Sequence, residues 1–122
     1  MHSGPIHVKY TDTALPGIAA TVNLYDSSLD GVELAHLGVQ RISWSIKHSG
    51  ALTVKAYHRN EADTAWIQIY DSGSLAAPAL TSRHDLYIGD FRHVKVDVLN
   101  GAAAQTTFDP QVALHTERSD SD

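Results

Sequence analysis

Apolar and polar residues alternate with a period of two along eight short stretches of this chain. A period of two puts successive side chains on opposite faces of an extended strand, so these stretches predict an all-β protein. The predicted strands span residues 5–11, 18–25, 39–47, 51–58, 64–70, 84–89, 91–98 and 102–114. Clusters of Gly, Pro, Asn, Asp and Ser separate them, as expected for turns. Residues 29–37 fit either a single helical turn or a bulged strand.

Four apolar rows define the strand faces that are expected to point inward. The rows are Ile42, Trp44 and Ile46; Leu52, Val54 and Ala56; Ala65, Ile67 and Ile69; and Val94, Val96 and Val98. Three-residue loops ending at Gly50 and at Gly101 bring neighbouring rows onto one face as β-hairpins. The third residue of such a loop is left-handed, a conformation that glycine adopts without steric cost. We therefore expect a positive φ at both glycines.

Short strands that are apolar on one face need a second layer to bury that face. The predicted fold class is therefore a two-sheet antiparallel sandwich, jelly-roll-like, of about eight strands, with a closed barrel as the alternative. Because no repeat or composition break divides the chain, residues 1–116 are expected to form one domain. Residues 117–122 are expected to be a disordered acidic tail. Residues 1–11 fit either the first strand of this sandwich or an arm that pairs with a neighbouring copy.

The composition excludes several classes of protein. The 122 residues contain no cysteine, which removes disulfides, thiolate zinc sites and thiol nucleophiles. No apolar run approaches the roughly 18 residues of a membrane span, and the first residues lack the order of a signal peptide. We therefore expect no membrane association and no export by that route. The formal charge is −5 and the basic residues are scattered, so nucleic acid is not an expected partner.

Most aromatic residues occupy the same alternate strand positions as polar residues, and not those of the apolar rows. Trp44 and Phe108 are predicted to point inward. Five rings are predicted to face outward: Tyr25, Tyr57, Trp66, Tyr70 and Tyr87. Rings of this kind stabilise an interface that buries them, so the sequence predicts an interaction surface anchored by Trp66 and Tyr70. Ile6, Val8 and Tyr10 belong to this candidate interface if the N-terminal segment is an arm. The alternatives are a segment that covers the rings and a platform for stacking on sugars.

Residues for catalysis or metal binding do not gather at a useful spacing. The eight histidines include no pair separated by two, three or four positions, the spacings that favour a metal site on one strand or helix. The fragment Asp71–Ser74 resembles the nucleophile region of some serine hydrolases, yet its surroundings indicate a turn. We therefore expect no enzyme activity, no cofactor and no bound metal. A small cupin-like metal-dependent enzyme is an alternative, because histidines from separate strands can converge in space.

Three segments near the C-terminus follow a familiar succession of strand and turn residues. They are Tyr87–Gly101, Gln105–Phe108 and Val112–Leu114. This succession resembles the end of small β-sandwich proteins of tailed bacteriophage virions, the head decoration or cement proteins. The resemblance implies a non-enzymatic structural protein of the virion, assembled in the host cytoplasm, that forms homotrimers and docks on the major capsid protein. A carbohydrate-binding β-sandwich module with an exposed aromatic platform is another alternative.

Overall fold

The computed structural model of the chain describes residues 6–9, 17, 19–27, 38–61, 64–76, 82–89 and 91–116. Within these ranges lie the strands β1 (Ile6–Lys9), β2 (Thr21–Asp26), β3 (Val39–His48), β4 (Leu52–Arg59), β5 (Ile67–Asp71), β6 (Ser82–Tyr87), β7 (His93–Asn100) and β8 (Phe108–Thr116). Each overlaps one predicted strand, although β8 begins six residues later than residue 102. The predictions for residues 29–37 and 117–122 lie outside the described residues. No helix in the described ranges is long and apolar enough to span a membrane.

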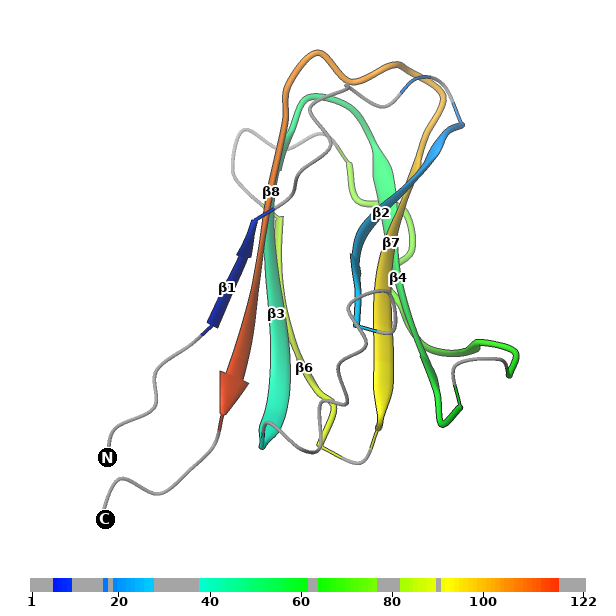
Figure 1. Cartoon of the computed structure of the whole chain (residues 1–122). Helices are drawn as coiled ribbons and strands as arrows, with labels where there is room; N and C mark the ends of the chain where they lie inside the picture. Colours follow the sequence, from blue (N-terminus) through cyan, green and yellow to red (C-terminus); the bar gives the residue numbers. More distant parts are fainter. Residues whose placement is uncertain are drawn as a thin grey trace.

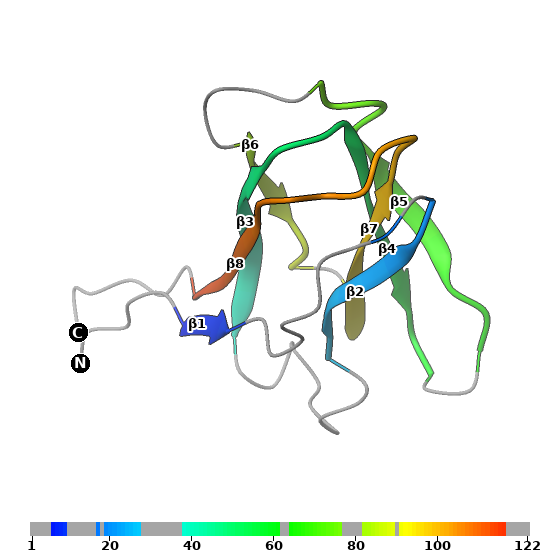
Figure 2. The ribbon, with the colours of Figure 1, turned by 90° about the horizontal axis from the view of Figure 1, so that it is seen from above.

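The strands form two antiparallel four-stranded sheets that pack face to face (Figures 1 and 2). Sheet A has the strand order β1-β8-β3-β6, and sheet B has the order β2-β7-β4-β5. Successive strands alternate between the two sheets, except that β4 and β5 are neighbours in sheet B. Eight strands connected in this way form a jelly roll. The prediction of a jelly-roll-like antiparallel sandwich is therefore confirmed.

Both predicted hairpins are wrong, because the strands that they join lie in different sheets. β3 belongs to sheet A and β4 to sheet B, so Leu52 pairs with Asn100 of β7 and not with Ile46. β7 and β8 are separated in the same way. Two sheets that face each other both turn an apolar row inward, and this gives the same alternation in sequence as a hairpin. The pattern alone therefore does not distinguish the two arrangements.

Gly50 and Gly101 also lack the predicted positive φ. Among the described glycines, φ is positive at Gly38 and Gly73. Gly101 meets a different requirement: its N–H donates to the carbonyl oxygen of Ala51 at 3.0 Å, and a Cβ at this position would lie 2.7 Å from that oxygen. Glycine is needed here because two backbone segments approach each other closely.

A buried glutamine joins the β3–β4 and β7–β8 connections, which lie together at the top of Figure 1. Gln105 is only 2% exposed. Its Oε1 accepts hydrogen bonds from the N–H groups of Ser49 and Gly50, both at 2.9 Å. Its Nε2 donates to the carbonyl oxygen of Gly50 at 2.9 Å and to Oδ1 of Asn100 at 2.7 Å. One side-chain amide therefore satisfies polar groups of both connections.

The core lies between the sheets and contains three of the four predicted apolar rows. The rows on β3, β4 and β7 are buried: Ile42, Trp44, Ile46, Leu52, Val54, Ala56, Val94, Val96 and Val98. Phe108 packs against this core, as predicted. The row through residues 65–69 is confirmed only at Ile69, which packs against the core. Ala65 precedes β5 and is exposed, and Ile67, near the start of this edge strand, is 58% exposed.

Candidate interaction surfaces

Two of the five rings predicted to face outward are turned inward by β-bulges. The register of β2 against β7 shifts between Asn23 and Tyr25, and that of β5 against β4 shifts between Gln68 and Tyr70. A bulge inserts one extra residue, which reverses the alternation of side chains beyond it. Tyr25 therefore lies in the core, 7% exposed, opposite the buried Val96. The outward orientations predicted for Tyr25 and Tyr70 are wrong for this reason.

Tyr70 is half-buried and packs against the rim of the core. Its ring stacks on His84 with the centroids 4.2 Å apart, and it meets the ring of Trp44 edge-on at 5.5 Å. Burial raises the pKa of the Tyr70 hydroxyl, and the carboxylate of Asp71 raises it further. The ring of Tyr70 on β5 thus packs against side chains of β3 and β6.

Both bulged strands of sheet B end in the same tripeptide, Tyr-Asp-Ser, at residues 25–27 and 70–72. The hydroxyl oxygen of Ser27 accepts a hydrogen bond from the N–H of Val94 at 3.0 Å, and that of Ser72 accepts one from Val54 at 2.9 Å. Each serine N–H donates back to the carbonyl oxygen of the same valine. The repeated tripeptide is a signal for both bulges that the alternation of residues does not reveal.

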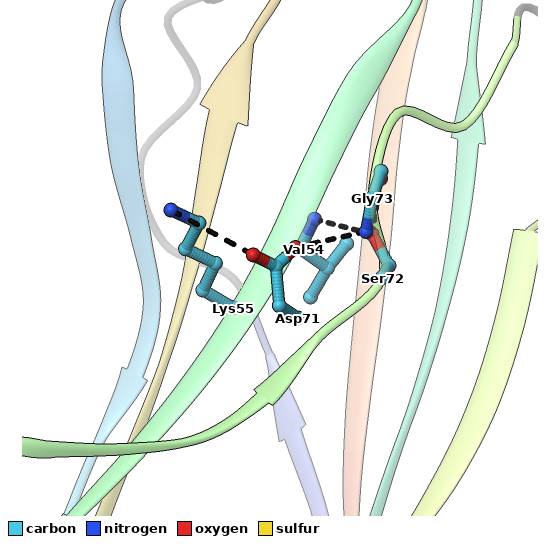
Figure 3. Close-up of polar contacts among 5 residues, drawn as sticks. All are labelled: Val54, Lys55, Asp71, Ser72 and Gly73. Atoms are coloured by element: carbon cyan, nitrogen blue, oxygen red, sulfur yellow. Dashed lines mark hydrogen bonds and ion pairs between the residues drawn. The ribbon is translucent and has the colours of Figure 1, made fainter.

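The fragment Asp71–Ser74 forms local backbone structure at the end of β5 (Figure 3). The N–H of Gly73 donates to Oδ1 of Asp71 at 2.8 Å, and the hydroxyl of Ser72 donates to the carbonyl oxygen of Gly73 at 2.7 Å. Gly73 has a φ of +67°, which glycine adopts readily. The side chain of Asp71 lies 3.9 Å from Lys55 Nζ. These contacts fix the backbone directly after β5.

A group of aromatic and cationic side chains lies around the β4–β5 end of sheet B. The guanidinium carbon of Arg59 is 4.0 Å from the ring centroid of Trp66. Nζ of Lys95 lies 5.0 Å from the ring of Tyr57 and 5.2 Å from that of Trp66. Arg59, Trp66, Lys95 and Tyr57 are termed the cation–aromatic patch. Ile67 is exposed but pairs with His58, so it lies on the other face of the sheet from Tyr57. The β4–β5 end of sheet B extends away from sheet A in Figure 1.

A carboxylate lies beside Lys95 of this patch. Oδ2 of Asp97 lies 3.3 Å from Lys95 Nζ, and its Oδ1 accepts a hydrogen bond from Nδ2 of Asn23 at 2.9 Å. Burial raises the pKa of the Tyr57 hydroxyl, and the negative charges of Asp97 and Asp71 raise it further. The Tyr57 hydroxyl is therefore protonated at neutral pH and can donate a hydrogen bond.

The outer face of sheet A holds an open depression of about 590 Å³. Short residues of the two central strands, including Ser43 and Ala113, line it together with longer polar side chains. Arg41 forms an ion pair with Asp85 across β3 and β6. The hydroxyl oxygen of Ser43 lies 2.8 Å from Nε2 of His115. Polar side chains that line the depression thus already contact one another.

The remaining predicted interface residues belong to sheet A or to the N-terminus. Tyr87 ends β6 and is 54% exposed. Ile6 and Val8 belong to β1, which pairs with β8 of the same chain so that Ile6 lies opposite Leu114. Tyr10 lies outside the described residues, as do the side chains of β1. β1 is thus observed as the first strand of its own sandwich.

The described histidines lie in separate local environments. Nδ1 of His48 lies 2.7 Å from the carbonyl oxygen of Gly50, and His58 stacks on Phe91 with the ring centroids 4.2 Å apart. Within the part of the chain that the structure describes, no three His, Asp or Glu side chains are placed to hold a metal ion. The described residues therefore offer no candidate metal site.

The jelly roll is similar to a solved structure described as the PBSX exported protein XepA. The TM-score is 0.72 and the sequences are 13% identical, over 96% of this chain and 39% of that chain. At this identity the similarity shows the fold alone, and this chain spans well under half the length of XepA. No family model matches the sequence, and no curated protein matches it.

Proposed function

We propose that this chain is a non-enzymatic structural protein of a bacteriophage virion, which decorates or cements the capsid. The observation that supports this most is the jelly roll shared with XepA, a phage-related protein. The resemblance of the C-terminal segments to virion decoration proteins points to the same class. Because one fold serves many functions, the proposal also needs surfaces suited to docking.

The cation–aromatic patch is the surface that we propose docks on shell subunits. Trp66 and Arg59 are residue types enriched at the energetic centres of protein interfaces. The guanidinium of Arg59 already lies over the Trp66 ring, so little side-chain freedom is left to lose on docking. The patch thus combines an ordered aromatic ring with two cations beside it.

A sugar platform is less well supported than protein docking. Arg59 occupies one face of the Trp66 ring, and Lys95 lies beside both Trp66 and Tyr57. A stacked sugar would have to compete with these cations for the ring. An acidic or polar protein surface, in contrast, can pair with the same cations while the ring is buried.

Self-association is part of the proposal, because one patch per copy provides only one weak contact. Linked copies engage several shell subunits at once, and the symmetry of the lattice then multiplies each contact. The resemblance to cement proteins implies a trimer, although any closed oligomer gives the same multiplication.

The docking proposal predicts that Trp66→Ala lowers attachment to phage particles more than it lowers stability. Purified protein is sedimented with particles of the phage that encodes it, and the bound fraction is measured. Because a hot-spot ring is lost, we expect at least tenfold weaker attachment, with the free energy of unfolding lowered by no more than about 1 kcal/mol. Leu99→Ala is the matched control: it shortens an apolar side chain of the same sheet outside the patch.

Equal attachment of the Trp66→Ala and Leu99→Ala variants would contradict the assignment of the docking surface. A Trp66→Ala variant that loses more stability than attachment would show that the ring serves the fold. Wild-type protein that fails to sediment with any particle would argue against docking itself.

A further inference from the structure

Three of the four sheet edges have features that discourage pairing with another chain. β1 is only four residues long, and β2 and β5 contain bulges. Short strands and bulges are common ways of protecting an edge. β6 has six residues and follows β3 without a register shift. Among the described strands it is therefore the longest regular edge.

The hydrogen bonds between β3 and β6 show which backbone groups face the open edge. The N–H of Ile88 donates to the carbonyl oxygen of Gln40 at 2.7 Å. These two residues are directly opposite, because Arg41 pairs with Tyr87. Hydrogen-bonded pairs alternate with non-hydrogen-bonded pairs along an antiparallel ladder. The even-numbered residues of β6 therefore bond to β3, and the N–H and C=O groups of its odd-numbered residues point away from β3.

Arg83 and Asp85 place opposite charges on this edge, and both are exposed. When β6 pairs antiparallel with β6 of a second copy about a two-fold axis at His84, Arg83 of each copy lies opposite Asp85 of the other. Both residues are odd-numbered, so each such pair exchanges two backbone hydrogen bonds. A shift by two residues sets Asp85 opposite Asp85, or Arg83 opposite Arg83, and like charges directly opposite are unfavourable. The order of the charges thus selects one register.

We propose that β6 joins two copies of this chain into a continuous eight-stranded sheet in this register. The inference names a contact for the self-association proposed above and rests on that part of the proposed function. The interface is isologous, since each copy contributes the same strand. Arg41 already pairs with Asp85 within each copy. In the pair of copies, each Asp85 carboxylate therefore lies between two guanidinium groups, one from each copy.

Charge reversal on β6 tests this contact. We expect the wild-type mass in analytical ultracentrifugation to rise with concentration toward about 26 kDa, twice the 13.2 kDa of one chain. Arg83→Asp or Asp85→Arg alone sets like charges opposite each other, and each should weaken association at least tenfold. An equimolar mixture of the two variants should associate again, because the acidic edge of one then faces the basic edge of the other. Lys47→Asp, a reversal on β3, is the control and should associate as wild type does.

Circular dichroism establishes that each variant folds. Association of the single variants at wild-type strength, or failure of their mixture to associate, would overturn the β6 contact. A wild-type trimer of about 40 kDa, three times 13.2 kDa, that is unaffected by both reversals would overturn it while supporting self-association. A protein that stays monomeric at every concentration would overturn both the contact and the self-association. Sedimentation with particles tests docking separately.

Discussion

At the scale of single residues, buried polar side chains set the positions of the corners of the sandwich. Gln105 bonds to backbone groups of Ser49 and Gly50 and to the side chain of Asn100. Sequence patterns predicted a positive φ at the glycines of these corners, which was wrong, and did not predict the role of this glutamine. A single buried glutamine has no periodicity, and its role becomes visible only when the two connections are brought together.

Replacing Gln105 by Ala should lower the free energy of unfolding by about 2–3 kcal/mol, as measured by urea denaturation. The reason is that the partly buried N–H of Gly50 and the buried Oδ1 of Asn100 each lose a hydrogen bond. Gln111→Ala removes an exposed glutamine of β8 and should change stability by less than about 0.5 kcal/mol. Equal effects of the two substitutions would refute the structural role of Gln105.

The Tyr57 hydroxyl should titrate above its ordinary pKa of 10.0, because burial and the carboxylates of Asp97 and Asp71 disfavour the phenolate. Between pH 10 and the raised pKa the folded protein holds a proton that the unfolded chain has lost, so stability falls as the pH rises through this window. Below pH 10 the contribution of Tyr57 to the free energy of unfolding is fully present. The measurement is an ultraviolet absorbance titration of the wild type and of the Tyr57→Phe variant. The difference between the two curves reports the titration of Tyr57. A midpoint at or below 10 in that difference would contradict the assigned environment.

At the scale of elements, the alternation of residues predicts strands well and predicts strand faces only where no bulge intervenes. β3, β4 and β7 each keep an unbroken buried row, and these rows were predicted correctly. Tyr25 and Tyr70 were assigned to the wrong face, because one inserted residue reverses the parity of all that follow. The bulges are stabilised by serines two residues beyond each tyrosine, through contacts with another strand.

Ser27→Ala and Ser72→Ala should each lower the free energy of unfolding by about 1–2 kcal/mol, since a backbone N–H of the adjacent strand loses its acceptor. Amide hydrogen exchange resolves the two sites. We expect Val94 to exchange faster in Ser27→Ala only, and Val54 to exchange faster in Ser72→Ala only. Ser74→Ala, at an exposed position, is the control and should leave both rates unchanged. Unaltered exchange in the first two variants would disprove this role of the serines.

At the scale of the whole molecule, the two-layer architecture followed from the one-sided strands, but the strand order within the sheets did not. A connection that crosses from one sheet to the other and a hairpin within one sheet give the same alternation of apolar and polar residues in the sequence. Only the packing of the two sheets decides between them. The cation–aromatic patch was also predicted only in part, because the sequence does not show which strands are neighbours in a sheet. Trp66 and Tyr57 were proposed from sequence, whereas Arg59 and Lys95 join them through positions on neighbouring strands.

The number of copies of this chain in purified phage particles tests the central claim most directly. Particles are purified from the host whose phage encodes the chain, and each protein is quantified by mass spectrometry against the major capsid protein. A decorating or cementing role predicts many copies per particle, in a constant ratio to the capsid protein. Particles that contain the capsid protein and none of this chain would contradict the account.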